Sequence, residues 1–293
     1  MRDAPIPFAK GHGAGNDFII VPDPDGLLAL SPDDVRSLCH RRTGIGGDGL
    51  LRAVRCAADP ESTSMSAQAE WFMDYRNSDG TNGAMCGNGI RVFARYLADT
   101  GLCQPGSVSI ATRAGIRQVH IPPPAAQDTS ITVDMGLPRL PGPADIEVVA
   151  GARRWSALHI DMGNPHAAVL VDDLAHAGDL NVAPTVTPST AYPEGVTVEF
   201  VAINSSHSLS VRVHERGVGE TFACGTGACA AVTALRRSQG HVGAGSYTVD
   251  FEGGRLQISV GADEAVQLTG PAVVILEGTV TLPRAEPLPG LGS

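Results

Sequence analysis

A short motif that occurs twice most constrains how this chain can fold. Cys86-Gly-Asn-Gly89 and Cys224-Gly-Thr-Gly227 are each followed by a helix-forming run, and a leucine stands 11 residues after each cysteine (97 − 86 and 235 − 224). A Gly-Asn loop precedes each motif, at residues 15–18 and 163–166. Either motif alone can arise by chance. The shared order and spacing instead predict two duplicated halves.

The chain between these motifs consists mainly of short β-rich runs. A first helix is expected from the cap residue Ser31 to about Arg42. Helices are also expected after each motif, over 90–97 and 228–235, and the second of these is apolar or small on every face and so should be buried. Residues 136–143 are rich in Pro and Gly and mark the passage between the halves. The expected strands are 108–112, 116–121, 130–135, 166–171, 196–203, 209–214, 247–251 and 255–260.

Composition excludes several classes of partner. The chain has 293 residues, enough for one large or two ordinary domains, and its formal net charge is −10. An acidic chain with 4% aromatic residues is a poor candidate for binding nucleic acid or an anionic membrane surface. No apolar run reaches membrane-spanning length, and the N-terminus lacks a secretory leader. We therefore expect a cytoplasmic protein whose six cysteines are reduced thiols.

Lys10 is the only lysine in the chain. Pyridoxal phosphate and Schiff-base enzymes need a lysine amine at the reacting centre, so we expect no such cofactor. The GxGxxG match at 44–49 follows a helix rather than a strand and does not indicate dinucleotide binding. Cys224 and Cys229 lie five apart on one helix and face different sides, so no metal site is expected. The four cysteines outside the motifs, at 39, 56, 103 and 229, are most simply core residues.

The repeated motif has a definite chemical meaning. A thiol at a helix start meets unpaired N–H groups and the positive end of the helix dipole, which predicts a lowered pKa. Its glycine neighbours allow a carboxylate to approach those N–H groups. Two such thiols that flank one carbon could remove a proton from one face and return one to the other, which inverts the centre.

Other polar residues lie near the motifs in sequence. Arg216 could hold a carboxylate, while His166 and Glu215 could tune or deprotonate a thiol. Simpler interpretations also stand, since Asn77-Ser-Asp-Gly80 could be only a turn and Arg216 only a surface ion pair.

Taken together, these segments resemble the diaminopimelate epimerase family. The resemblance rests on residues 10–18, 77–89, 163–166 and 215–227, and it extends over about residues 6–280. It implies a β-rich α/β (α+β) fold of two pseudo-symmetric domains, each a barrel-like mixed sheet around a central helix, with the active site in the cleft between them. The implied domains are 1–130 plus 272–293 and 131–271, with a last strand at about 272–280 that returns to the first domain.

The resemblance also implies an activity and partners. The reaction would interconvert LL- and meso-2,6-diaminopimelate without a cofactor, for lysine and peptidoglycan synthesis in the cytoplasm. The only partners expected are this small substrate and a second copy of the chain, since members are commonly homodimers.

Residue roles follow from the matching positions. Cys86 would be the proton donor and Cys224 the proton acceptor for the LL isomer, with His166 and Glu215 beside them. The substrate-binding positions would be Asn16, Asn77, Gly87, Asn88, Asn164, Thr197, Glu215, Arg216, Gly225 and Thr226. The chain departs from the family in two places: Gly49 stands where many relatives have Gln, and Thr197 stands where Asn is usual.

Two alternatives remain. One is a proline or hydroxyproline racemase or epimerase of the same duplicated fold, although those relatives tend to have His where this chain has Asn88. The other is a thiol-redox protein. Redox pairs usually lie close in sequence, however, whereas these cysteines are 138 residues apart (224 − 86).

Overall fold

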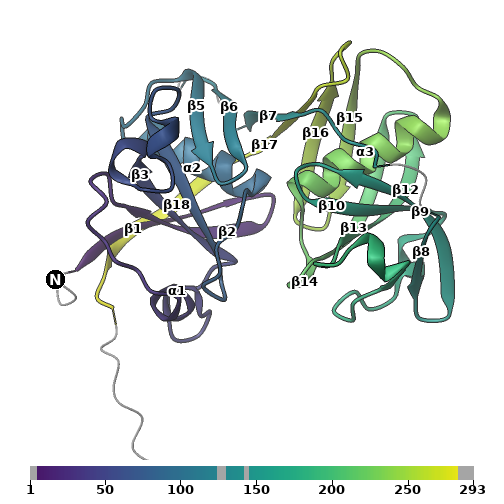
Figure 1. Ribbon diagram of the computed structural model, residues 1–293, viewed down its shortest axis with the longest axis horizontal. Helices are drawn as coiled ribbons and strands as arrows, with labels where there is room; N and C mark the ends of the chain where they lie inside the picture. The colour runs from purple at the N-terminus through teal and green to yellow at the C-terminus, as the bar shows by residue number, and fades with distance from the viewer. Residues whose placement is uncertain (1–4, 124–129, 142–144, 283–293) are drawn as a thin grey trace, which may run out of the picture.

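The computed structural model describes residues 5–123, 130–141 and 145–282. The expected domain ends at 1–4 and 283–293, and residues 142–143 of the expected passage between the halves, lie outside the described residues. Within them the chain forms two lobes that meet at a pair of strands (Figure 1). In the described part of the chain, no helix is long and apolar enough to cross a membrane.

The first lobe is built around helix α2 (Gly87–Asp99). A second, shorter helix, α1 (Pro32–Cys39), and the 3-10 turns Cys56–Ala58 and Thr63–Met65 lie outside the sheet. The strands in chain order are β1 (Ile6–Gly13), β2 (Asn16–Pro22), β3 (Gly49–Arg55), β4 (Trp71–Asn77), β5 (Gly106–Thr112), β6 (Gly115–Ile121) and β7 (Ser130–Gly136).

The second lobe is built around helix α3 (Gly225–Gln239). Its 3-10 turns are Leu174–Ala177 and Ser189–Ala191. The strands are β8 (Ile146–Ala150), β9 (Arg153–Asp161), β10 (Pro165–Val171), β11 (Thr185–Thr187), β12 (Thr197–Ser205), β13 (Ser208–Glu215), β14 (Gly219–Thr221), β15 (Gly245–Phe251), β16 (Gly254–Val260) and β17 (Val266–Pro271).

The strand pairing repeats from one lobe to the other. Along β1 to β5 the successive pairs are antiparallel, parallel, antiparallel and parallel. The order is the same along β9, β10, β12, β13 and β15. In each lobe the central helix lies in the chain between the last two of these strands. The predicted duplication of the chain is therefore confirmed.

Two strand pairs join distant parts of the chain. Strand β7 pairs with β17, so the sheet continues from one lobe into the other. The last strand, β18 (Val273–Val280), pairs with β1, so the chain ends in the lobe where it began (Figure 1). This confirms the expected return of the last strand.

The two central helices are buried as their sequences predict. The apolar stripe of α2, which includes Ile90 and Leu97, is fully buried, and in α3 every residue from Gly225 to Arg236 is buried. Side chains from both helices belong to one hydrophobic cluster that spans the two lobes. Gly101 and Gly240, both with positive φ, follow the helices and end them.

The predicted strands are all present, but the predicted end of the first helix is wrong. Ser31 caps α1 and forms a capping box with Asp34, as its sequence suggests. The helix nevertheless ends at Cys39 rather than near Arg42. The chain turns back there, and the N–H groups of Gly44 and Gly46 donate to the carbonyls of His40 and Leu38. This glycine-rich turn leads into β3 and not into a helix, as the sequence predicts.

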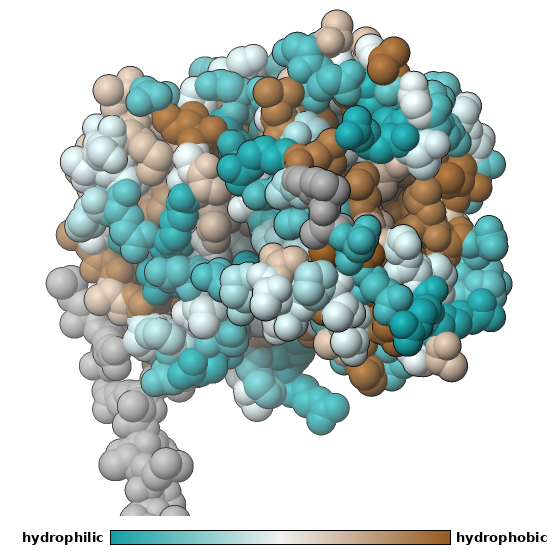
Figure 2. Space-filling view, turned by 45° about the vertical axis from the view of Figure 1, so that its right-hand side comes forward, coloured by the Kyte–Doolittle hydropathy of each residue, from teal (hydrophilic) through white to brown (hydrophobic). Residues whose placement is uncertain are grey.

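The surface of the molecule mixes hydrophilic and hydrophobic side chains. On the face shown in Figure 2, hydrophilic side chains predominate and hydrophobic ones gather towards the right-hand side.

Candidate active site

Each motif cysteine caps a helix through its sulfur atom. Cys86 is the N-cap of α2 and Cys224 the N-cap of α3. The Sγ atom of each accepts a hydrogen bond of 3.3 Å from the backbone N–H three residues later, at Gly89 and Gly227 respectively. The two thiols therefore have the same local geometry at their helix starts.

The fold brings these two helix starts into contact. A Cβ atom added to Gly87 would lie 3.3 Å from the Cα atom of Gly225, and one added to Gly225 would lie 3.1 Å from Cα of Gly87. The contact between α2 and α3 is thus one of backbone against backbone, which only glycine permits. It places the residue that follows each cysteine against its counterpart in the other lobe.

Asn16 and Asn88 surround Cys86. The Cys86 thiol lies 3.8 Å from Oδ1 of Asn16, and the Asn88 amide donates to the same oxygen at 3.4 Å. Asn88 also donates to the carbonyl of Ala223 at 3.0 Å, next to the second cysteine. The Asn16 amide in turn donates to Asp48 at 2.6 Å. Asn88 therefore links the two lobes at the site.

A chain of polar side chains leads away from Cys224. Its Sγ atom lies 3.4 Å from Oγ1 of Thr226, which accepts a hydrogen bond from the Asn164 amide at 3.4 Å. Oδ1 of Asn164 lies 3.1 Å from Nε2 of His166, and Nδ1 of His166 lies 2.6 Å from Oε1 of Glu199. His166 and Glu199 are both fully buried. Glu199 therefore fixes the orientation of the histidine ring.

The Glu215-Arg216 pair is divided between the interior and the surface. Glu215 accepts a hydrogen bond from the hydroxyl of Thr221. The guanidinium of Arg216 is partly exposed and lies 3.8 Å from the Glu194 carboxylate. The backbone N–H of Arg216 donates to Oγ1 of Thr197 at 3.3 Å. Thr197 thus fixes the backbone at Arg216.

Asn77 lies in a turn. Its carbonyl oxygen accepts from the N–H of Gly80 at 2.9 Å, and its side-chain amide donates to Thr81 at 3.0 Å. Its Oδ1 accepts a hydrogen bond of 2.8 Å from the Tyr75 hydroxyl. The interpretation of 77–80 as a turn is confirmed, and any contact of Asn77 with substrate stays a prediction.

Gly49 has no room for a side chain. A Cβ atom there would lie 2.7 Å from the carbonyl oxygen of Arg76 and 2.8 Å from the ring of Tyr75. Gly49 stands where many relatives have glutamine, and β3 packs tightly against β4 at this position.

The pKa of both thiols is raised in this structure, although a helix start alone can lower it. Burial raises the pKa of Cys86 to about 12, although the N–H of Gly89 opposes the rise. Burial also raises the pKa of Cys224 well above its ordinary value, and the carboxylates of Glu215 and Glu199 add to the effect. The pKa of Glu215 is itself raised by burial. Removal of water from the thiols outweighs the favourable effect of the helix starts.

Sequence reasoning missed several residues that contact the predicted site. Glu199 holds His166, Asp48 holds Asn16, and Arg91 donates to Asn88 at 2.9 Å. Glu199 had a usable signal, since an acid within the apolar run 196–203 indicates a buried charge. Asp48 and Arg91 had no comparable signal, because their contacts depend on the tertiary fold.

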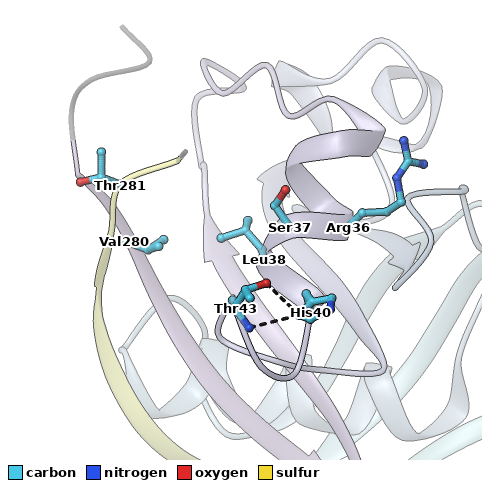
Figure 3. Close-up of a pocket in the computed structure, with 8 residues that line it drawn as sticks. Arg36, Ser37, Leu38, His40, Thr43, Val280 and Thr281 are labelled. Atoms are coloured by element: carbon cyan, nitrogen blue, oxygen red, sulfur yellow. Dashed lines mark hydrogen bonds between the residues drawn. The ribbon is translucent and has the colours of Figure 1, made fainter. Parts of the chain in front are cut away.

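A cavity of about 510 Å³ lies at the end of α1 and contains none of the predicted site residues. It is lined by Arg36, Ser37, Leu38, His40, Thr43, Gly44, Val280 and Thr281. Its polar groups already have partners: Figure 3 shows Thr43 bonded to the His40 ring, and Arg36 donates to the carbonyl of Asp79. No group of His, Cys, Asp or Glu side chains in the described residues is arranged to hold a metal ion.

Comparison with proteins of known sequence gives strong matches over nearly the whole chain. The profile of the diaminopimelate epimerase family matches residues 8–141 and 158–275. A diaminopimelate epimerase from Streptomyces coelicolor is 52% identical over 278 residues, which cover 93% of this chain and 94% of that protein. One from Thermobifida fusca is 44% identical over 279 residues, 94% of this chain and 98% of that protein.

Solved structures show the same fold at low sequence identity. A phenazine biosynthesis protein of the PhzF family from Bacillus anthracis has a TM-score of 0.68 at 17% identity and covers 94% of this chain and 99% of its own. A hydroxyproline epimerase from Agrobacterium vitis also has a TM-score of 0.68, at 14% identity, and covers 96% of this chain and 94% of its own.

The duplicated fold and these matches define an isomerase of the epimerase class. Within that class, the chain belongs to the diaminopimelate epimerase family.

Proposed function

We propose that this protein interconverts LL- and meso-2,6-diaminopimelate by proton transfer between Cys86, Cys224 and the α-carbon of the substrate. The observation that carries the proposal is the contact between two helices that each begin at one of these cysteines. The substrate assignment rests on membership of the family. The alternative of a proline or hydroxyproline isomerase has only fold-level likeness behind it.

The reaction needs a base on one face of the α-carbon and an acid on the other. With the LL isomer, the Cys224 thiolate takes the α-proton, and the electron pair left on carbon spreads into the adjacent carboxylate. Cys86 then gives its thiol proton to the opposite face. Cys224 ends as a thiol and Cys86 as a thiolate, and the reverse reaction restores the starting state.

Stabilisation of the carbanion-like transition state falls to the helix starts. The backbone N–H groups of Gly87, Asn88, Gly225 and Thr226 lie in the first turns of α2 and α3, where N–H groups lack helical partners. Fixed donors in a site without water stabilise developing negative charge strongly. A carboxylate at these helix starts would receive them, with no cofactor as electron sink.

The remaining predicted residues would orient the substrate and tune the thiols. We assign Asn16, Asn77, Asn164 and Arg216 to contacts with the amino and carboxylate groups, with Thr197 holding the backbone at Arg216. His166 and Glu215 would adjust the proton affinity of Cys224. Reduced thiols are essential to this chemistry, which favours a cytoplasmic location.

The strand pairings support a division of the chain into two domains. We infer a first domain of residues 1–130 plus 272–293 and a second of 131–271. The pairing of β18 with β1 supports the return of the chain to the first domain. The pairing of β7 with β17 supports a junction near residues 130 and 271.

We also infer that the chain forms a homodimer through β18. Among the described strands, β18 pairs only with β1, so its other edge carries free N–H and C=O groups. Ile275 and Leu276 on this strand are 52% and 45% exposed. Uncovered apolar edge strands promote association, which favours a second copy as the cover.

The deciding experiment treats the purified, reduced protein with LL-diaminopimelate in D2O and no added cofactor. We expect the meso isomer to form with deuterium at the α-carbon. Cys86→Ala and Cys224→Ala should each abolish epimerisation, whereas Cys103→Ala should keep it. Turnover that depends on pyridoxal phosphate, or near-normal turnover by either active-site variant, would contradict the mechanism. Reversible disulfide cycling without any amino-acid turnover would indicate a redox protein instead.

A further inference from the structure

Arg91 of α2 carries a buried positive charge with no carboxylate partner in the part of the chain that the structure describes. Its side chain is fully buried, and arginine keeps its charge in such places. The guanidinium donates to the carbonyl of Gly87 at 3.0 Å and to Oδ1 of Asn88 at 2.9 Å. Its Nε atom has no hydrogen-bond partner among these residues. A buried charge without a counter-ion is unfavourable, so this one calls for a functional reason.

The guanidinium lies in a slot formed by two glycines. A Cβ atom on Gly13, at the end of β1, would lie 3.2 Å from Nη2 of Arg91. One on Gly270, in β17, would lie 3.2 Å from both Nη2 and Cζ. Strand β17 is the one that joins the lobes. The charge is therefore held rigidly at the junction of the two lobes.

The guanidinium in this slot is bonded to the two residues that follow the first active-site thiol. Both acceptors of Arg91, Gly87 and Asn88, immediately follow Cys86 in the chain. Arg91 opposes the rise in the pKa of Cys86 that burial causes, while Glu215 adds to that rise. Burial lowers the pKa of Arg91 to about 10, and the nearby thiols of Cys86 and Cys229 oppose this fall.

The second active-site thiol has different neighbours. After burial, the main causes of the raised pKa of Cys224 are two carboxylates, Glu215 and Glu199. Burial raises the pKa of Tyr75 of β4, and the charges of Glu215 and of both active-site thiols add to the rise. The two cysteines thus match in backbone geometry but differ in their charged neighbours. Glu215 opposes a negative charge on both, whereas Arg91 favours one on Cys86 and Glu199 opposes one on Cys224.

We infer that Arg91 is a positioning residue that holds the resting thiolate of the pair on Cys86. The inference rests on the proposed two-cysteine function. When the pair loses one proton, a negative charge on Cys86 is attracted to the fixed guanidinium, and one on Cys224 is repelled by Glu199. Glu215 repels a charge on either thiol, so the difference rests on Arg91 and Glu199. The resting enzyme would then be in the form that accepts a proton from the meso isomer.

The test measures the pH dependence of alkylation at each cysteine. Iodoacetamide reacts with the thiolate, and mass spectrometry of peptides gives the rate at Cys86 and at Cys224 separately. The midpoint on the pH axis is compared rather than the rate itself, because Cys86 is the more exposed thiol. We expect the midpoint of Cys86 to be the lower of the two in the unmodified protein.

Variants of Arg91 separate its charge from its packing. Arg91→Met should raise the midpoint of Cys86 by about one to three pH units and change that of Cys224 less. Arg91→Lys keeps the charge and should leave the midpoint of Cys86 close to that of the unmodified protein. Arg95→Met is the matched control, because Arg95 lies one turn further along α2 and already pairs with Asp99 at 3.6 Å. It should leave both midpoints in place. The same Arg91→Met shift should appear in the pH profile of kcat/KM.

Two results would overturn the inference: a lower midpoint for Cys224 than for Cys86 in the unmodified protein, or an unchanged Cys86 midpoint in folded Arg91→Met. If Arg91→Met does not fold, the midpoints of the unmodified protein and of Arg91→Lys still decide the matter. Both cysteines could prove necessary for deuterium incorporation while the midpoints differ from those expected. In that case only the role of Arg91 is wrong. If neither cysteine is required, the proposed function fails as well.

Discussion

Cys86 and Cys224 each accept a hydrogen bond from a helix start, yet burial raises the pKa of both. The magnitudes explain why. A helix terminus favours a nearby charge by about 0.3–2 kcal/mol, whereas removal of an ion from water costs several kcal/mol. A thiolate is therefore harder to form here than in water and, once formed, is a stronger base. A strong base suits the removal of a weakly acidic α-proton.

The buried pair of Glu199 and His166 gives a prediction at this scale. Glu199→Gln keeps the shape of the side chain and removes the carboxylate 2.6 Å from Nδ1 of His166. Hydrogen bonds to charged groups contribute about 1.5–3 kcal/mol, which corresponds to a fall in kcat of about 10–100-fold. Steady-state epimerisation kinetics measure this fall, with KM changed less because Glu199 is not placed against substrate.

The control for this prediction is Glu220→Gln. Glu220 pairs with Arg212 at 2.7 Å on the partly exposed face of β13 and β14. This variant should keep its kcat. Normal turnover by Glu199→Gln would show that the orientation of His166 does not depend on the carboxylate.

At the scale of elements, two helices from different lobes meet at residues that have no side chain. Gly87 and Gly225 do not have positive φ, so an alanine could adopt the backbone conformation of either. What opposes alanine is the backbone of the opposite helix, which would have to move by a few tenths of an ångström. Leu268 opposes it too, because its Cδ2 would lie 3.0 Å from a Cβ at position 87 and 2.9 Å from one at position 225. These glycines set how closely the two helix starts approach.

Gly225→Ala should therefore separate the two helix starts by a few tenths of an ångström or more. Because misplacement of about 1 Å can cost about 100-fold in rate, we expect kcat to fall at least about tenfold while the protein stays folded. Activity per folded molecule, with thermal unfolding measured in parallel, tests this expectation.

Gly101→Ala provides the comparison. Gly101 has φ +72° and no atoms within 4 Å of an added Cβ, so alanine there should lower the stability and leave kcat per folded molecule unchanged. Equal losses of kcat in both variants would mean that general destabilisation, rather than helix spacing, explains the effect.

On the scale of the whole molecule, the sheet runs through both lobes, and among the described strands β18 is a long strand with a partner on one side only. The pairing of β7 with β17 joins the lobes, and β18 covers β1 on one side only. The main hydrophobic cluster draws residues from both halves. We expect the two domains to unfold together, because neither buries its central helix start without the other.

The unpaired edge of β18 gives the prediction at this scale. Light scattering coupled to gel filtration should give the unmodified protein twice the 30.3 kDa mass of one chain. Ile275→Lys places a charge on the exposed edge strand and should shift the mass towards the monomer. Val242→Lys is the control, since Val242 is 90% exposed in the other lobe and should leave the mass unchanged. A monomeric unmodified protein would contradict the proposed interface.

Much of the fold could be predicted from the sequence because its signals are local. The strands alternate or run apolar between turn residues, the α1 cap is a Ser-Pro-Asp-Asp run, and the glycines after α2 and α3 end those helices. The α1 end could not be predicted in this way, since the later turn at Gly44–Gly46 sets it.

The sequence by itself determined the duplicated halves, the two thiols at helix starts and the lack of a suitable lysine, because each depends only on residue type and spacing. The tertiary structure alone decided the state of those thiols. It pressed the helix starts together through Gly87 and Gly225, removed water from the sulfur atoms, and set Arg91 behind one and Glu199 near the other. Desolvation and charge act over distances in space, and residues remote in the chain fix those distances only when it folds.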